Sequence, residues 1–259
     1  MIPLAVTVGA HGGRFGAEAR RAARAWGLPF LERPAKGGVA ALLARDARAC
    51  LVLSADGWAL RDAHGSLAFS PGLAMVRLKR LAAGRQQEDV LVRLGELKAG
   101  DTVVDATLGL AADALVCARA VGPTGRVVGI EASLPLWILV SEGLARQPPF
   151  PGSTRVEAVH GSAREVLATW PTGGADVVTL DPMFDRPKKA SPTFELLRAH
   201  AVHEPLDEAT LREARRVARR WVVVKGGRYG HEFRRLQLQA LPLNRFGPVV
   251  WARAGPLGA

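Results

Sequence analysis

The sequence predicts an α/β protein with a doubly wound, mostly parallel sheet, preceded by a small N-terminal α/β unit. From residue 102 onward, short apolar stretches alternate with segments of helical periodicity, which is typical of repeated βα units. Residues 177–180 and 221–224 are continuous apolar runs, as expected for parallel strands that are buried on both faces. Together these observations favour one main parallel sheet.

Residues 1–70 are expected to form the small N-terminal unit. Its predicted strands are residues 4–8, 28–32, 50–54, 58–61 and 67–69, and its predicted helices are residues 15–26 and 39–45. Asp56 and Gly57 give a strong hairpin signal. A basic helical linker is predicted for residues 71–100, with helices at 73–83 and 87–97.

Residues 101–259 are expected to form the main domain. Its predicted strands are residues 102–105, 126–131, 155–160, 175–181, 221–225 and 247–253, and its predicted helices are residues 111–121, 134–147, 163–170 and 206–218. A long loop is expected between the strand that ends at 181 and the helix at 206. Because ligands bind at the carboxyl ends of parallel strands, we expect the site there.

The composition limits the class of protein. Hydrophobic residues make up 48% and charged residues 23%, as in globular proteins, and no apolar run approaches the ~20 residues of a membrane span. We expect no signal peptide, no membrane association and no metal, because the two cysteines and the histidines lack metal-ligand spacing. The expected location is the cytoplasm.

The net charge of +11 favours a polyanionic partner, above all a nucleic acid. The alternative is a GC-rich genome that supplies arginine wherever a charge is needed, since arginine greatly outnumbers lysine. Charge alone leaves both explanations open.

A first candidate site follows the predicted strand that ends at Asp105. The turn from there to the next helix contains Thr107 and Gly109, and Asp113 lies near the helix start. Gly109 can let the backbone approach a ligand closely. Because the turn has only one glycine, an ordinary βα turn with Asp113 beside the helix dipole is the alternative.

Two further candidates end the next two strands. Glu131 lies where an acid can accept hydrogen bonds from both ribose hydroxyls of an adenosine cofactor, although it could also cap the following helix. Its spacing from the first site favours cofactor binding. Ser162 could flank the adenine ring, and its spacing from Glu165 also predicts a capping box.

The fourth candidate is the tetrapeptide Asp181-Pro182-Met183-Phe184. The Asp181 carboxylate and the Pro182 carbonyl can accept hydrogen bonds from an exocyclic amine and so orient its nitrogen lone pair toward a methyl donor. Phe184 offers a face on which a base can stack. A strand-ending turn with Phe184 in the core is the alternative, but the preceding βα units and Glu131 favour a functional site.

Cations lie near this tetrapeptide. Arg186, Lys188 and Lys189 follow it, and they would hold a phosphate backbone or simply form a solvated loop. Lys225 ends a strand at the same sheet edge and could contact substrate or form part of a turn. Met183 and these four cations are therefore the predicted substrate-binding or RNA-binding residues.

These four sites, in this order, resemble the class I S-adenosylmethionine-dependent methyltransferases. The tetrapeptide and its lysine-containing loop resemble the bacterial small-subunit rRNA guanine-N2 methyltransferase family and its relatives, over about residues 70–230. The resemblance implies a Rossmann-like fold, S-adenosylmethionine as methyl donor and the N2 amine of guanine in rRNA as acceptor. It assigns cofactor binding to Asp105, Thr107, Gly109, Asp113, Glu131 and Ser162, and catalysis to Asp181, Pro182 and Phe184.

Two departures from that family concern the first loop and the N-terminus. Ala111 stands where the rRNA enzymes have a further glycine, and residues 1–70 do not match them. The alternatives are a methyltransferase for DNA or a small molecule, and a non-enzymatic RNA-binding protein on the same scaffold. A nicotinamide dehydrogenase would need a fuller glycine-rich turn and would leave the tetrapeptide unexplained.

Overall fold

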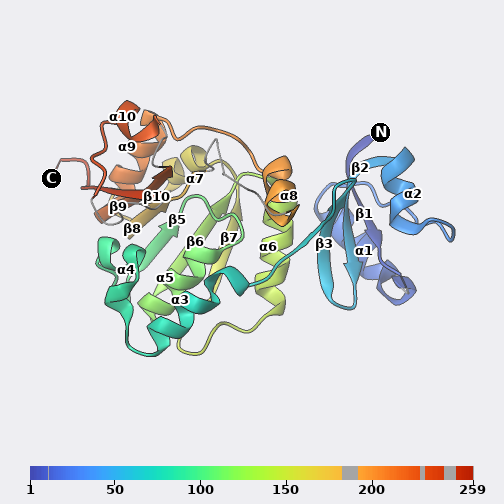
Figure 1. Ribbon diagram of the computed structural model, residues 1–259, viewed down its shortest axis with the longest axis horizontal. Coiled ribbons are helices and arrows are strands. Elements are labelled where there is room, and N and C mark those ends of the chain that lie inside the picture. Colours follow the sequence, from blue (N-terminus) through green and yellow to red (C-terminus); the bar gives the residue numbers. More distant parts are fainter. Residues whose placement is uncertain (11, 183–191, 228–230, 242–248, 259) are drawn as a thin grey trace. The chain divides into compact units, whose positions relative to one another are not determined.

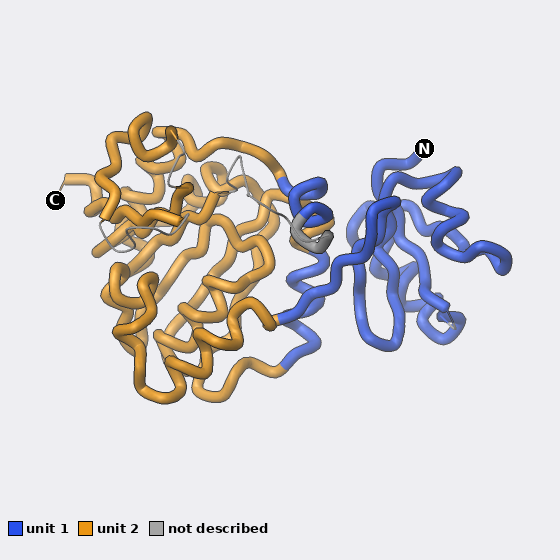
Figure 2. The backbone as a smooth tube through the Cα atoms, in the orientation of Figure 1, with its two compact units in different colours: residues 1–70, 138–147, 189–201 blue, residues 71–137, 148–188, 202–259 orange. Residues whose placement is uncertain are grey.

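The chain forms two compact units in a computed structural model that describes residues 1–10, 12–182, 192–227, 231–241 and 249–258 (Figures 1 and 2). The first unit comprises residues 1–70, 138–147 and 189–201, and the second comprises residues 71–137, 148–188 and 202–259. Residues 71–100, for which the sequence predicts a linker, belong to the second unit. No helix in the described ranges is both long and apolar enough to cross a membrane.

The first unit contains a four-stranded sheet in the order β1-β2-β3-β4. Its elements are β1 (Ile2–Val8), the 3₁₀ helix η1 (Gly12–Phe15), α1 (Gly16–Ala25), α2 (Gly38–Arg45), β2 (Ala47–Ser54), β3 (Gly57–Asp62), β4 (Ser66–Ala68) and α8 (Pro192–His200). β1 and β2 are parallel, and β3 and β4 extend the sheet as antiparallel strands.

Two sequence predictions concerning this unit are wrong. Residues 28–32 do not form a strand, because Phe30 makes only an isolated bridge to Val6. Pro29 lacks the N–H that a longer ladder would need. The loop expected after residue 181 contains α8, whose start at Pro192 suits the first turn of a helix.

The second unit contains a six-stranded sheet in the order β10-β9-β8-β5-β6-β7. Its strands are β5 (Thr102–Asp105), β6 (Arg126–Glu131), β7 (Val156–His160), β8 (Ala175–Leu180), β9 (Ala218–Gly227) and β10 (Val249–Ala254). Every neighbouring pair is parallel except β9 and β10. This confirms the predicted mostly parallel, Rossmann-like sheet.

Helices cover both faces of this sheet (Figure 1). The helices of the second unit are α3 (Gly72–Ala82), the 3₁₀ helix η2 (Gln86–Glu88), α4 (Val90–Gly95), α5 (Ala112–Val121), α7 (Ala163–Thr169), α9 (Glu208–Val217) and α10 (Glu232–Arg235). α6 (Leu134–Arg146) begins in the second unit, and its residues from 138 onward belong to the first. α7 and α9 pack against one set of alternating strand residues, such as Val104 and Val178. α5 packs on β5 and β6 with α3 and α4 beside it. The single helix predicted for residues 87–97 is instead η2 and α4, because Asp89 interrupts it and caps α4.

The strand order creates a switch point at β5. The chain runs from β5 outward through β6 to β7 and then crosses to β8, on the other side of β5. The helices that follow β5 and β8 therefore diverge, and a crevice is expected at the carboxyl ends of these two strands. Asp105 ends β5, and Asp181 follows the last residue of β8.

Gly129 in β6 leaves no room for a side chain beside the loop that follows β5. A Cβ atom there would lie 2.3 Å from Cδ1 of Leu108. We expect Gly129→Ala to lower the free energy of unfolding by about 1–3 kcal/mol, because the buried leucine must shift. Gly255→Ala is the matched control, since no heavy atom lies within 4 Å of its Cβ position. Equal denaturation midpoints for the two variants would contradict this packing.

Candidate active site

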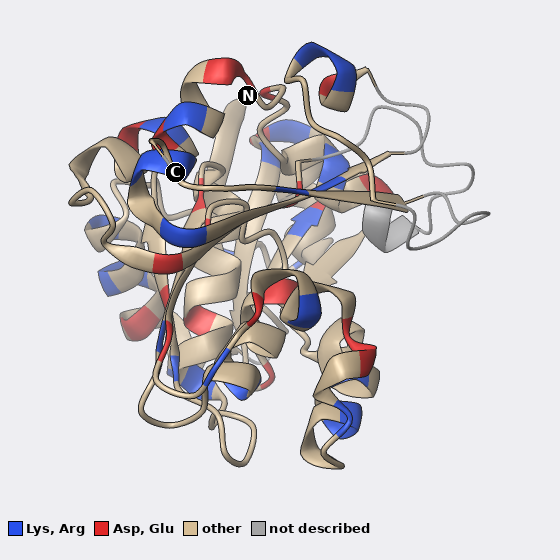
Figure 3. Cartoon of the chain, turned by 90° about the vertical axis from the view of Figure 1, so that its left-hand side faces the viewer, with Lys and Arg blue, Asp and Glu red and all other residues tan. Residues whose placement is uncertain are grey.

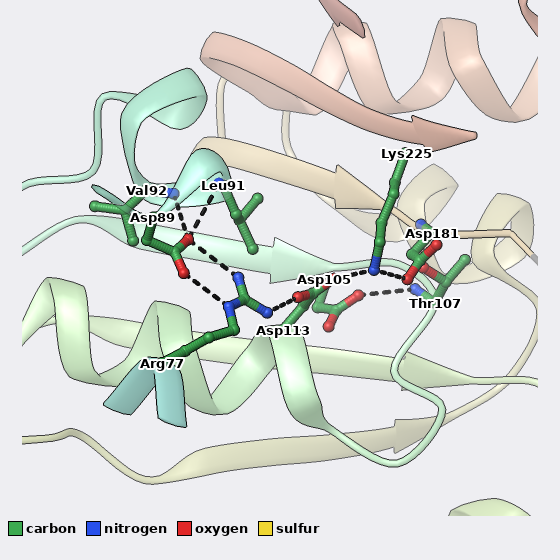
Figure 4. Close-up of polar contacts among 9 residues, drawn as sticks. All are labelled: Arg77, Asp89, Leu91, Val92, Asp105, Thr107, Asp113, Asp181 and Lys225. Carbon is green, nitrogen blue, oxygen red and sulfur yellow. Dashed lines mark hydrogen bonds and ion pairs between the residues drawn. The ribbon is translucent and has the colours of Figure 1, made fainter. Parts of the chain in front are cut away.

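The carboxyl edge of the large sheet brings most of the predicted site residues together. Figure 4 shows Asp105, Thr107, Asp113, Asp181 and Lys225 in one network of polar contacts. Gly109 and Glu131 form a second, directly bonded pair. Pro182 follows Asp181 and is partly exposed. Five predicted residues lie outside the described residues: Met183, Phe184, Arg186, Lys188 and Lys189.

Glu131 holds the loop after β5 against the end of β6. Its Oε2 accepts a hydrogen bond from Gly109 N at 2.9 Å, and its Oε1 accepts one from Ser133 N at 2.9 Å. Burial raises the pKa of Glu131, although these two N–H groups favour its charged form. A carboxylate has about four acceptor positions, so roughly two remain for hydroxyl donors.

Thr107 connects the same loop to the start of the tetrapeptide. Its backbone N–H donates to Asp105 Oδ1 at 3.1 Å, and its Oγ1 accepts a hydrogen bond from Asp181 N at 2.6 Å. One threonine therefore fixes the ends of β5 and β8 relative to each other. This couples the predicted cofactor loop to the predicted catalytic residue.

Asp105 is a buried acid with an unused acceptor. Its Oδ2 has no hydrogen-bond partner among the described residues. Burial, and then the negative charge of Asp113, raise the pKa of Asp105 to about 7. An unpartnered carboxylate oxygen at this position is suited to accept a hydrogen bond from a ligand.

Ala111 adopts the left-handed conformation, with φ 62°, at the N-cap of α5. Glycine enters this conformation freely, whereas alanine is strained there by about 1 kcal/mol. The loop still closes, because Ala111 N donates to Leu108 O at 2.7 Å and Gly109 N reaches Glu131. The departure noted in the sequence therefore introduces strain but leaves the loop closed.

Ser162 lies at the same sheet edge, after β7. Its Oγ accepts a hydrogen bond from Glu165 N at 3.3 Å and caps α7. The predicted capping role is confirmed by this contact. Its role beside the adenine ring stays a prediction.

Two functional candidates were missed in the sequence. Arg77 on α3 forms a bidentate ion pair with Asp89, at 2.7 and 3.0 Å, and also pairs with Asp113. In the sequence Arg77 is one of several cations on a basic helix, so nothing distinguishes it. Asp89 precedes an apolar run in the manner of a helix cap, which was the only available signal.

Comparison with known proteins decides the family. A family model with the description "Putative SAM-dependent methyltransferase" matches residues 44–240. The chain belongs to this family. A Bacillus subtilis protein with the name "Uncharacterized protein YpiP" is 34% identical over 213 residues, covering 80% of this chain and 82% of YpiP.

Three relatives of this methyltransferase carry the name ribosomal RNA small subunit methyltransferase J. The one from Laribacter hongkongensis is 38% identical over 135 residues, covering 49% of this chain and 47% of its own length. The one from Alteromonas mediterranea is 29% identical over 217 residues, covering 77% of each chain. A solved methyltransferase structure from Neisseria gonorrhoeae has the same fold, with a TM-score of 0.65 at 23% identity, covering 98% of this chain and 96% of that chain.

S-adenosylmethionine is the cofactor of this methyltransferase. The residues at the sheet edge fit it. Glu131 retains acceptor positions for ribose hydroxyls, and Asp105 Oδ2 is a buried acceptor without a partner among the described residues. Gly109 has a φ of 50°, a left-handed conformation that glycine adopts without strain, and its N–H donates to Glu131.

Asp105→Asn is expected to stabilise the cofactor-free protein at alkaline pH. The raised pKa means that the folded state keeps a proton which the unfolded state releases, so stability falls as the pH rises from about 4 to 7. Asparagine removes this penalty, and the gain in free energy of unfolding should be at least about 1 kcal/mol larger at pH 8 than at pH 5.5. Urea denaturation at both pH values measures it. Asp56→Asn, at an exposed hairpin turn, is the control. If both variants gained the same free energy of unfolding between pH 5.5 and pH 8, the buried position of Asp105 would not be the cause.

Glu131→Gln is expected to weaken S-adenosylmethionine binding by about tenfold or more, because hydrogen bonds to a charged acceptor are worth about 1.5–3 kcal/mol. Isothermal titration calorimetry measures the dissociation constant. Glu157→Gln is the matched control, since Glu157 lies on neighbouring β7 and pairs at the surface with Arg126. Unchanged affinity in the Glu131 variant would remove this residue from the cofactor site.

Proposed function

We propose that this methyltransferase modifies an exocyclic base amine, the N2 of guanine, in rRNA. The observation that carries the proposal is the position of Asp181. Its backbone is bonded to Thr107 in the loop that precedes α5, and its carboxylate is 31% exposed at the sheet edge. A hydrogen-bond acceptor thus lies next to the cofactor loop, where an amine can be oriented.

Charge and relatives support a nucleic-acid acceptor. The net charge is +11, and three relatives are named as ribosomal RNA methyltransferases. Figure 3 shows basic and acidic residues interspersed over the described part of the chain. A ribosomal acceptor also agrees with the cytoplasmic location expected from the sequence.

The chemistry assigned to the chain is mainly positioning. Asp181 and the Pro182 carbonyl accept hydrogen bonds from the amine, which turns its lone pair toward the donor. S-adenosylmethionine, when bound, would supply the methyl group, and the nitrogen lone pair that Asp181 and Pro182 orient would accept it. The methylated nitrogen then releases its proton along the hydrogen bond to Asp181. Phe184 would stack on the base.

Asp181→Ala is expected to lower the rate of methyl transfer by at least about 100-fold while leaving S-adenosylmethionine binding within about twofold, because misplacing a reacting group alone costs about that much. The assay offers radiolabelled cofactor with unmodified rRNA transcripts, small ribosomal subunits, DNA and a metabolite extract. Digestion of labelled rRNA should yield N2-methylguanosine.

Glu204→Ala, at an exposed loop acid in the same unit, is the control for this substitution. Full transfer by Asp181→Ala would remove the proposed role of Asp181. Label in DNA or in a small molecule, with none in RNA, would replace the proposed acceptor by one of the alternatives that the sequence left open.

A further inference from the structure

A chain of five alternating charges runs through the second unit and ends at Asp181 (Figure 4). Asp89 binds Arg77 through both carboxylate oxygens, and Arg77 also pairs with Asp113. Asp113 Oδ2 lies 3.4 Å from Lys225 Nζ, and Lys225 Nζ lies 2.5 Å from Asp181 Oδ2. Each partner therefore has an opposite charge on either side, except at the two ends.

We propose that Lys225 is a positioning residue that keeps the Asp181 carboxylate ionised and oriented as an acceptor, and that Arg77, acting through Asp113, keeps Lys225 in place. This inference rests on the proposed function, because it assigns a partner to the acceptor named there. It replaces the substrate contact that the sequence suggested for Lys225.

The surroundings of Lys225 leave its ammonium little freedom to bind a phosphate. Lys225 lies in β9 opposite Trp251 of β10, and its Nζ is 5.5 Å from the centre of the Trp251 ring. The ring covers one side of the ammonium, while Asp113 and Asp181 accept from it. The side chain is 23% exposed. An ammonium has three donors, and two of them are already used.

The need for a cation follows from the charges around Asp181. Asp113 on α5, and Asp105 on β5 when it is ionised, repel the Asp181 carboxylate, while Lys225 on β9 and Arg77 on α3 attract it. Burial, together with Asp113, leaves the pKa of Asp181 above its ordinary value even with Lys225 present. Without Lys225 the carboxyl would keep its proton to higher pH. A protonated carboxyl can donate to the amine nitrogen and so occupy the lone pair that must attack.

Arg77 anchors the other end of the chain. Asp89 Oδ1 accepts from Leu91 N and Val92 N at 3.1 and 3.2 Å, so this carboxylate is fixed by the first turn of α4. A bidentate pair to a fixed carboxylate holds the guanidinium in one orientation. Asp113 is then held between Arg77 and Lys225 and cannot turn away from the ammonium without losing Arg77.

The test compares Lys225→Met, whose unbranched side chain replaces that of lysine as far as Cε and lacks the ammonium, with Lys225→Arg. The first readout needs no activity: the ¹³C carboxyl signal of Asp181 is titrated in the cofactor-free full-length protein and assigned by its loss in Asp181→Asn. We expect its midpoint to move to higher pH in Lys225→Met and to return toward the original value in Lys225→Arg. Lys98→Met, at an exposed turn, is the control.

The second readout is the pH profile of methyl transfer. In Lys225→Met we expect kcat to fall about tenfold or more on the acid side and to recover at alkaline pH, with the KM for RNA and the affinity for S-adenosylmethionine unchanged. Arg77→Met should shift the profile in the same direction by less. It also serves as the second variant if Lys225→Met does not fold.

The inference would be overturned if the titration midpoint of Asp181 stayed unchanged in Lys225→Met and in Arg77→Met. A raised KM for RNA with an unchanged pH profile would also overturn it and would return Lys225 to substrate binding. Failure of the proposed function gives a different result, namely full activity of Asp181→Asn on every acceptor. In proteins that retain Asp181, its titration would still show whether Lys225 controls its ionisation.

Discussion

The active edge of the sheet depends on the ion pairs that the Lys225 ammonium makes with Asp113 and Asp181. Parallel neighbours β5 and β8 end side by side, so Asp105 and Asp181 meet in a largely buried place together with Asp113. Removing three carboxylates from water is costly unless cations compensate for them. Lys225 and Arg77 provide this compensation from two other elements. The fold can therefore keep an acidic site at its switch point without losing stability there.

The acids at this edge have different partners, and the partners give them different properties. Glu131 accepts two backbone N–H groups and is held rigidly, which suits a residue that defines a binding site. Asp105 accepts one N–H and has a pKa of about 7. Asp181 is bound to a cation and remains partly exposed. Because their environments differ, these neighbouring carboxyl groups ionise at different pH values. One sheet edge can therefore hold acids suited to binding beside an acid suited to a chemical step.

The sequence revealed the sheet because its strands are continuous apolar runs, and it revealed the acids because parallel strands end at a common edge. It could not reveal Arg77, whose partners Asp89 and Asp113 lie 12 and 36 positions further along the chain. Lys225 was located correctly at the edge, but its neighbours come from α5 and from the end of β8. A contact between distant elements has no local pattern. The strand predicted at residues 28–32 is absent for a related reason. A strand needs a neighbouring strand to pair with, and the periodicity of the sequence does not show whether one is present.

The arginine run on α9 and β9 shows why net charge is a weak guide to RNA binding. Arg215 and Arg216 donate to backbone carbonyls at 2.8 Å, and Arg219 donates to Gly173 O at 2.5 Å. Arg220 pairs with Asp101 and donates to Gly95 O. These guanidinium groups satisfy loop carbonyls and helix ends, so much of their hydrogen-bonding capacity is used within the fold. Under the proposed function, affinity for an RNA backbone would depend on cations outside this run and would be smaller than a net charge of +11 suggests.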